Sequence, residues 1–263
     1  MTELLAPAKI NLALVVGTTL PDGRHEVATV LQRISLADRI TLESAEELQV
    51  LGFLEDTLVR RALEGLAREA GVPPRWRVTI DKQIPVAAGL GGGSSDAAAA
   101  LRLANWTLSR PLDDNALREL AAGLGADVPF FLTTGPQLGE GDGTVLTPLD
   151  IPHDYWILVL LPHGRRKTST GAVYDAFRGE DGFDQRRAEL LKALALGDLG
   201  ALPPNDLASS PLAEELRNHG AFRADVSGAG PAVYGLFGEQ EDAIAAHAAL
   251  ADRGPTWIAA PAW

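Results

Sequence analysis

The chain has 263 residues, of which 46% are hydrophobic and 22% are charged, a composition typical of globular proteins rather than disordered ones. Its 35 acidic residues outnumber its 23 basic residues, and the net charge of −12 argues against nucleic acid and membranes as partners. The absence of cysteine excludes disulfides, thiol catalysis and cysteine-ligated metal sites, and it fits a cytoplasmic location.

The first 150 residues are predicted to mix strands with helices. Apolar periodicity predicts strands at residues 9–16, 25–34, 39–43, 75–81 and 145–149. A helix is expected from Asp56, a plausible N-cap, to a stop at Gly71, because the apolar residues between them recur at helical spacing. Further helices are expected at residues 96–108 and from Asp113 to about residue 123.

The remaining residues show a pattern of their own. Strands are predicted at residues 155–161, 223–226, 232–237 and 256–259, with helices at 170–177, 185–196, 211–219 and 240–252. When the additional helices are set aside, the order is β-α-β-β-α-β, which is the ferredoxin-like order. We therefore expect two domains, residues 1–150 and 151–263.

A glycine-rich segment carries the strongest local signal. Four glycines fall among residues 89–93, and two serines follow them where a helix is predicted to begin. Glycines let the backbone approach a ligand closely, and a helix N-terminus offers free N–H donors and partial positive charge. This combination favours a phosphate site over the alternative, a flexible loop with a serine cap. Ser94 breaks both the P-loop pattern and the dinucleotide-binding fingerprint.

Lys9 and Asn11 form a second candidate site. On a strand they share one face, so they predict either a polar site at the edge of the core or an exposed strand end. Spacing alone does not separate these two readings.

Two further segments have simpler explanations at this stage. Asp127 stands among small and apolar residues, and it is either an N-cap before Pro129, the favoured reading, or a general base. Residues 227–231 join two predicted strands, and a hairpin turn explains them without a ligand.

Taken together, the motifs resemble those of the GHMP kinase superfamily. Its three signatures correspond to residues 6–12, 85–95 and 226–231. The sequences Asp-Gly-Arg-His at 22–25 and Gly-Ala-Asp-Val-Pro at 125–129 narrow the resemblance further. They point to the branch that phosphorylates the 2-hydroxyl of 4-diphosphocytidyl-2-C-methyl-D-erythritol, in the methylerythritol phosphate pathway to isoprenoid precursors.

The resemblance implies an α+β, two-domain GHMP kinase fold. Its N-terminal domain would be a mixed-sheet ATP-binding domain, and its C-terminal domain would be ferredoxin-like. Alternatives are another GHMP kinase, acting on homoserine, mevalonate or a sugar, and a non-catalytic nucleotide-binding protein of this fold. The protein is expected to be a monomer or a homodimer.

The resemblance also assigns catalytic and nucleotide-binding roles. Asp127 would take the hydroxyl proton, while Lys9 would keep Asp127 ionised and neutralise charge on the transferred phosphoryl group. Thr57 would lie near the adenine, where the family commonly has Asn. ATP, with Mg²⁺ and Ser95 as its possible ligand, is implied as cofactor. The ATP phosphates would be cradled by Pro85, Val86, Ala87, Ala88, Gly89, Leu90, Gly91, Gly92, Gly93, Ser94 and Ser95.

The implied substrate is a small molecule carrying a cytidine diphosphate. His25 would hydrogen-bond the cytosine, and Tyr174 would place its ring against that base. Arg24 stands where the family usually has Tyr, and a guanidinium plane can stack on the base in its place. The remaining substrate-binding residues implied by the resemblance are Asn11, Thr170, Gly228 and Gly230.

Overall fold

The structure, a computed structural model, describes residues 2–53, 57–164, 170–177 and 182–263. The chain forms two compact units, and each is built from separate stretches of sequence. Unit 1 comprises Met1–Ala8, Leu36–Val86 and Gly91–Thr134. Unit 2 comprises Lys9–Ser35, Ala87–Leu90 and Gly135–Trp263. The domain boundary near residue 150 stays a prediction.

The two N-terminal strands are longer than the sequence suggested. β1 spans Thr2–Thr19, and β2 spans His25–Ser44 as one strand where two were predicted. Asp38, which lies between the two predicted strands, is fully buried within β2, and it is paired there with the ammonium group of Lys82.

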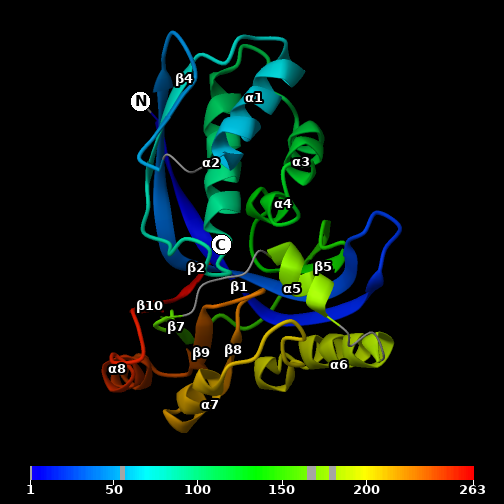
Figure 1. Cartoon of the computed structure of the whole chain (residues 1–263), viewed down its shortest axis with the longest axis vertical. Helices are drawn as coiled ribbons and strands as arrows, with labels where there is room; N and C mark the ends of the chain where they lie inside the picture. The colour runs from blue at the N-terminus through cyan, green and yellow to red at the C-terminus, as the bar shows by residue number, and fades with distance from the viewer. Residues whose placement is uncertain (1, 54–56, 165–169, 178–181) are drawn as a thin grey trace. The chain divides into compact units, whose positions relative to one another are not determined.

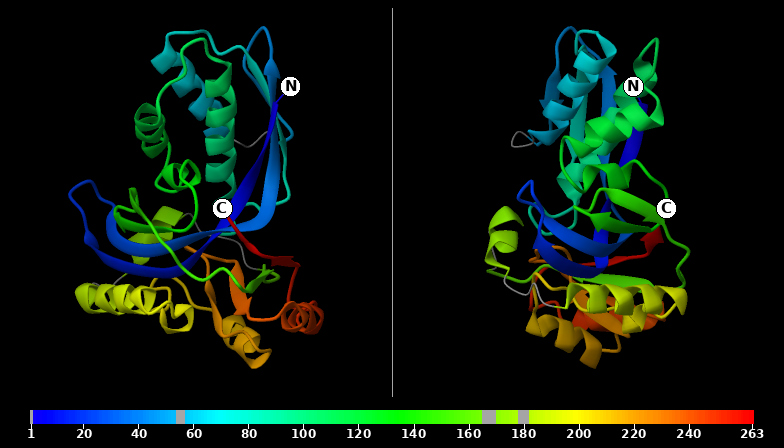
Figure 2. Two further views of the ribbon diagram at one scale, coloured as in Figure 1. Left: turned by 180° about the vertical axis from the view of Figure 1, so that it is seen from behind. Right: turned by 90° about the vertical axis from the view of Figure 1, so that its right-hand side faces the viewer.

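The described residues of unit 1 place four helices against a small sheet. The second half of β2 pairs antiparallel with β4 (Trp76–Asp81), and β3 (Gln49–Leu51) pairs parallel with β4. Figures 1 and 2 show the helices gathered on one face of these strands. They are α1 (Leu58–Ala70), α2 (Gly92–Thr107), α3 (Asp114–Ala122) and α4 (Val128–Phe131).

In unit 1, glycines end α1 and begin α2. α1 ends at Gly71, whose φ of +67° gives the left-handed C-cap that was expected. α2 begins at Gly92, four residues before the predicted start. Gly91, with φ +70°, turns the chain into the helix, so the last glycines of the segment belong to its first turn.

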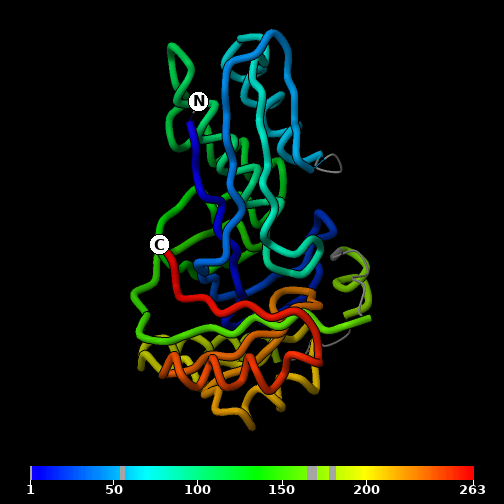
Figure 3. The backbone as a smooth tube through the Cα atoms, turned by 90° about the vertical axis from the view of Figure 1, so that its left-hand side faces the viewer, coloured from blue at the N-terminus to red at the C-terminus, as the bar shows by residue number. Residues whose placement is uncertain are grey.

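Unit 2 contains part of the first sheet. The first half of β2 pairs antiparallel with β5 (Gln137–Gly141), which pairs with β6 (Val145–Pro148). β5 was not predicted, because its sequence, Gln-Leu-Gly-Glu-Gly, is rich in glycine. The last strand, β11 (Pro261–Ala262), also pairs with β2, and Figure 3 shows the red C-terminal segment leading into it.

Unit 2 also contains a complete four-stranded antiparallel sheet, whose spatial order is β10-β7-β9-β8. Its strands are β7 (Trp156–Leu160), β8 (Arg223–Val226), β9 (Val233–Phe237) and β10 (Thr256–Ala259). With α7 (Pro211–Asn218) and α8 (Gln240–Ala249), they give the predicted β-α-β-β-α-β order. Leu158, Leu216 and Phe237 belong to the core of this sheet and its helices.

The other helical elements of unit 2 are α5 (Thr170–Ala176), α6 (Phe183–Ala195) and the short 3₁₀ helix η1 (Leu199–Ala201). Tyr174 lies in α5, and Phe177 directly follows that helix. Both pack against Leu14, Val16 and Val27 of the long strands. Within the described ranges, no helix is both long enough and apolar enough to cross a membrane.

Candidate active site

Lys9 and Asn11 lie on β1 in unit 2, and both side chains are buried, with 4% and 5% exposed. The Lys9 Nζ donates to the Asn11 Oδ1 at 2.5 Å, and the Asn11 Nδ2 donates to the Thr29 Oγ1 at 2.8 Å. Thr29 in turn donates to the Ala13 carbonyl. This chain of bonds orients the amide so that its oxygen faces the ammonium group. The alternative of an exposed strand end is therefore wrong.

The two glycine segments touch each other within unit 2. The Ser227 hydroxyl donates to the Gly89 carbonyl at 2.9 Å, and the Ala232 N–H donates to the Ala88 carbonyl at 2.9 Å. A Cβ on Gly89 would lie 2.3 Å from the Ser227 carbonyl oxygen, and the φ of Gly89 is +85°. Only glycine fits this position, because both the space and the backbone angle exclude a side chain.

The second glycine segment also lies against the lysine. A Cβ on Gly228 would stand 3.4 Å from the Asn11 Oδ1 and 3.5 Å from the Lys9 Nζ. Gly228 and Gly230 both have positive φ, +56° and +72°. The segment joins β8 to β9 as expected, but it does more than turn the chain, since the space beside Gly228 where a side chain would lie is bordered by Asn11 and Lys9.

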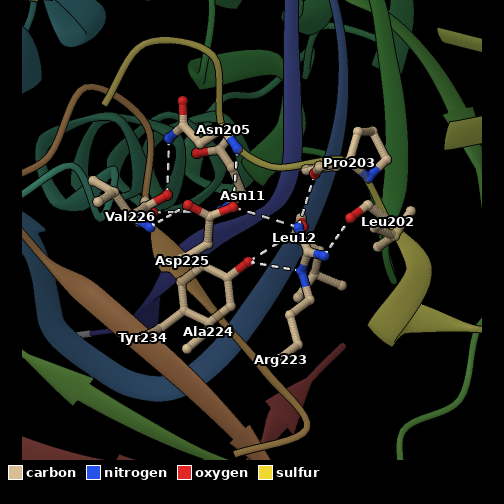
Figure 4. A network of polar contacts seen from close by, with 12 residues as sticks. Asn11, Leu12, Leu202, Pro203, Asn205, Arg223, Ala224, Asp225, Val226 and Tyr234 are labelled. Carbon is tan, nitrogen blue, oxygen red and sulfur yellow. Dashed lines mark hydrogen bonds and ion pairs between the residues drawn. The ribbon is translucent and has the colours of Figure 1, made fainter. Parts of the chain in front are cut away.

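A buried polar network supports the second glycine segment, residues 227–231, through hydrogen bonds to its backbone and to the end of β8 (Figure 4). The Asn205 Nδ2 donates to the carbonyls of Val226 and Gly228, at 2.8 and 2.7 Å. The Asn205 N–H donates to the Asp225 carboxylate, and the Asn205 Oδ1 accepts from the Leu207 N–H. One amide side chain thus fixes both ends of the turn from β8 into the glycine segment.

The same network continues to β1 through Arg223 and Tyr234. The Arg223 guanidinium donates to the carbonyls of Leu202 and Pro203 and to the Tyr234 hydroxyl, and that hydroxyl donates to the Leu12 carbonyl. Burial raises the pKa of Tyr234 to about 12, so the hydroxyl keeps its proton. The sequence analysis missed this network. Asn205, a polar residue directly after two prolines, was a local signal in the sequence for part of this network.

An aromatic group surrounds His25 in unit 2. The His25 ring lies 5.8 Å from the Tyr174 ring and 6.0 Å from the Phe177 ring, between centroids. The His25 Nδ1 lies 3.1 Å from the Gly17 carbonyl oxygen. Because a carbonyl can only accept, Nδ1 is the donor in this contact, which leaves Nε2 as the acceptor of the neutral ring. Phe177 was missed, although its spacing of three from Tyr174 placed it on the same helical face.

Arg24 is held by acidic neighbours in unit 2. Its guanidinium donates to the Asp22 carboxylate at 2.8 and 2.6 Å and forms a second ion pair with Asp142. The Asp22 side chain raises the pKa of Arg24, and Arg24 in turn lowers the pKa of Asp22. Stacking of this guanidinium on a base stays a prediction.

The N-terminus of α2 lies in unit 1. Ser95 is buried, and its Oγ has no hydrogen-bond partner among the described residues. The Ser95 N–H donates to the Gly91 carbonyl, while Gly93 is exposed with open space where a side chain would be. In the preceding loop, Val86 and Ala87 are exposed, whereas Ala88 and Leu90 are buried anchors.

Asp127 and Thr57 occupy the N-cap positions of α4 and α1 in unit 1. Neither side chain makes a capping hydrogen bond. Asp127 therefore stands at the helix N-cap that the sequence predicted before Pro129, but its half-buried side chain does not bond to the N–H groups of that helix. Asp56 and the side chain of Thr170 lie outside the described residues.

Two family models match the chain. "GHMP kinases N terminal domain" matches residues 57–135, and "GHMP kinases C terminal" matches residues 184–256. A crystal structure of mevalonate kinase, 13% identical, superposes with a TM-score of 0.76 over 100% of this chain and 99% of that chain, which shows the shared fold. The chain is a GHMP kinase, an ATP-dependent small-molecule kinase with the two-domain α+β fold of that class.

More similar proteins narrow the class to one family. The 4-diphosphocytidyl-2-C-methyl-D-erythritol kinase of Gloeobacter violaceus is 37% identical over 95% of this chain and 90% of its own length. A crystal structure of 4-(cytidine 5'-diphospho)-2C-methyl-D-erythritol kinase is 33% identical, covers both chains completely and has a TM-score of 0.84. The chain belongs to the 4-diphosphocytidyl-2-C-methyl-D-erythritol kinase family.

Proposed function

We propose that this protein transfers the γ-phosphoryl group of ATP to the 2-hydroxyl of 4-diphosphocytidyl-2-C-methyl-D-erythritol. The supporting observation is the buried Lys9 ammonium beside two touching glycine segments, in a chain whose full-length relatives carry that enzyme's name. The substrate hydroxyl oxygen attacks the γ-phosphorus, the bond to the bridging oxygen breaks, and ADP leaves. The hydroxyl proton passes to a base.

The proposed division of labour follows from what phosphoryl transfer requires, which is positioning and charge neutralisation. The Lys9 Nζ is fixed by Asn11, so its charge is placed without a reorganisation cost and stabilises the phosphoryl group in transit. Asp127 is the proposed base for the hydroxyl proton, because it stands in the Gly-Ala-Asp-Val-Pro sequence at 125–129 that matches the family's catalytic aspartate.

Mg²⁺ fits the first turn of α2. The buried Ser95 Oγ has no protein partner within the described part of the chain, and free helix N–H groups favour the nucleotide phosphates nearby. Ser95 would hold the metal together with the phosphates. When bound, Mg²⁺ neutralises charge between the β- and γ-phosphoryl groups.

The aromatic group suits a cytosine base. The acceptor at the His25 Nε2 is complementary to the exocyclic amino group of cytosine, which donates hydrogen bonds. The rings of Tyr174 and Phe177 offer apolar faces on which a base can stack. Arg24 departs from the family's usual Tyr, so this part of the proposal depends on the remaining rings.

A coupled assay of ADP release tests the proposal directly. Wild-type protein is given ATP, Mg²⁺ and either the cytidine-diphospho substrate or 2-C-methyl-D-erythritol without the cytidine diphosphate. Turnover is expected only with the complete substrate. Proven ATP binding with no turnover on either compound would contradict the assignment, and homoserine, mevalonate and sugars would then be tried as acceptors.

The catalytic roles predict a particular kinetic pattern. Lys9→Ala and Asp127→Asn should each lower kcat far more than they raise KM, because both groups act on the reacting atoms rather than on the bound ground state. Steady-state kinetics with both substrates measures the split. A raised KM with unchanged kcat would instead make either residue a binding residue.

A further inference from the structure

A buried ion cluster in unit 1 consists of Lys82, Asp38 and Asp96. The Lys82 Nζ lies 2.5 Å from an oxygen of Asp38 and 2.8 Å from an oxygen of Asp96. Both carboxylates are fully buried, and the lysine side chain is 16% exposed. The ammonium also lies 5.9 Å from the centroid of the Phe53 ring. None of these three charged residues has a role in the chemistry described above.

The cluster connects the two ends of the first glycine loop, which is the segment of residues 85–95. Where the chain enters the loop, the Asp38 Oδ1 accepts from the backbone N–H groups of Gln83 and Ile84, at 2.6 and 2.8 Å. Where the chain leaves the loop, Asp96 lies in the first turns of α2, directly after Ser95. Lys82 bonds to both carboxylates, so a single ammonium group ties the entry of the loop to its exit.

The lysine also lies directly against the loop. A Cβ on Gly92 would stand 3.2 Å from the Lys82 Nζ and 3.1 Å from the Ile84 side chain. That is tighter than ordinary van der Waals contact, so the absence of a side chain at Gly92 lets the ammonium approach the helix N-terminus. The proposed phosphate-binding N–H groups are therefore fixed relative to the strand end that precedes them.

Stability alone is a weak explanation for such a cluster. Two buried carboxylates share one ammonium, and moving charges out of water often costs as much as their mutual attraction returns. Burial raises the pKa of Asp96 to about 8, although the Lys82 charge opposes this rise. Burial alone would lower the pKa of Lys82, but the two carboxylates outweigh it and raise that pKa.

We propose that Lys82, Asp38 and Asp96 form a positioning cluster that holds the first glycine loop in its nucleotide-binding conformation and so sets the affinity for ATP. This inference rests on the proposed function, in which that loop cradles the ATP phosphates. The three residues act through the loop backbone and not on the reacting atoms. Loosening them should weaken nucleotide binding selectively, with the acceptor substrate affected much less.

The test is a double variant, Lys82→Gln/Asp96→Asn, which removes the ammonium group and one buried carboxyl group of the cluster and keeps polar side chains in their places. Its matched control is Arg77→Gln/Glu43→Gln, which removes the exposed ion pair between the same two strands, β4 and β2. The readouts are the Kd of Mg·ATP by calorimetry, the KM of each substrate, and Tm. We expect the Kd of ATP to rise at least tenfold in the cluster variant, with the acceptor KM within threefold and the control within twofold throughout.

A conservative replacement of Lys82 tests whether the charge itself maintains the affinity for ATP. Lys82→Arg keeps the charge and its donors, and it should retain an ATP Kd within threefold of wild type. A folded double variant with an ATP Kd within twofold of wild type would overturn the positioning role. If the double variant does not fold, Asp96→Asn alone is judged by the same twofold threshold. Failure of the wild-type protein to bind ATP would instead overturn the proposed function, so the two failures are distinguishable.

Discussion

The two glycine segments are supported by different kinds of polar group. The first segment is held at its two ends by the Lys82 cluster of unit 1, in which one ammonium group bonds to two buried carboxyl groups. In unit 2, the second is held mainly by amide and guanidinium donors bonded to backbone carbonyls. A backbone carbonyl does not titrate, whereas a buried carboxylate does. The first support is therefore sensitive to pH. The second is a mainly geometric support, because its amide and guanidinium donors do not titrate, although it also contains the buried carboxyl group of Asp225, whose pKa is raised by burial.

The largest expected effect comes from breaking the charged support. Lys82→Met would leave the buried carboxylates of Asp38 and Asp96 without their cation, and we expect a loss of about 3–5 kcal/mol in the free energy of unfolding. Urea unfolding followed by circular dichroism measures this loss. A change below about 1 kcal/mol in the free energy of unfolding would mean that water reaches the two carboxyl groups readily, so that the cluster behaves like a surface ion pair.

A smaller loss is expected from the geometric support. Asn205→Ala would leave the carbonyls of Val226 and Gly228 without their donor, at a cost of about 1–3 kcal/mol. Asn105→Ala is the matched control, since Asn105 is also buried and bonds the backbone of Leu112 in both directions. Both variants should lose comparable stability, but only Asn205→Ala should lower kcat/KM. Equal activity in the two variants would contradict a positioning role for Asn205.

The third prediction concerns pH and separates the two supports most cleanly. Burial raises the pKa of Asp96 to about 8 in the folded protein, whereas the ordinary pKa of an aspartate, 3.8, applies in the unfolded chain. Between these values the folded state binds more protons, so the free energy of unfolding falls as pH rises, by up to about 1.4 kcal/mol per pH unit from this group.

Asp96→Asn removes that contribution. The difference between wild-type and variant unfolding free energies, measured in urea at pH 5, 6, 7 and 8, should slope with pH. The same difference for Asn205→Ala should be flat, since no titrating group is lost. A flat difference for Asp96→Asn would show that Asp96 is ionised in the folded protein across this range.

Local sequence patterns predicted much of this arrangement. The alternation of a strand placed Lys9 and Asn11 on one face, and the element order gave the ferredoxin-like sheet. The glycine run marked the start of a helix, although α2 begins four residues earlier than expected because Gly91 supplies the left-handed turn into it.

The supports of the two glycine segments could not be predicted in the same way. Ser227 bonds to Gly89 across 138 positions of sequence, and Lys82 bonds to Asp38 across 44. Asp38 fell between two predicted strands, and an acidic residue within a buried strand requires a cation that only tertiary structure supplies. The cooperation of Lys9 with Asp127 stays a prediction of the family resemblance.

The interleaving of the units along the chain has a consequence for fragments of this protein. β2 contributes residues to both units, and the last strand, β11, pairs with it. A fragment consisting of residues 151–263 would carry the four-stranded sheet intact, yet it would lack β2 and the Lys9 and Gly89 neighbours of its own glycine turn. Expressed as two halves, the protein would have to reassemble before the two glycine segments could touch, so recovery of activity on mixing the halves would report that contact.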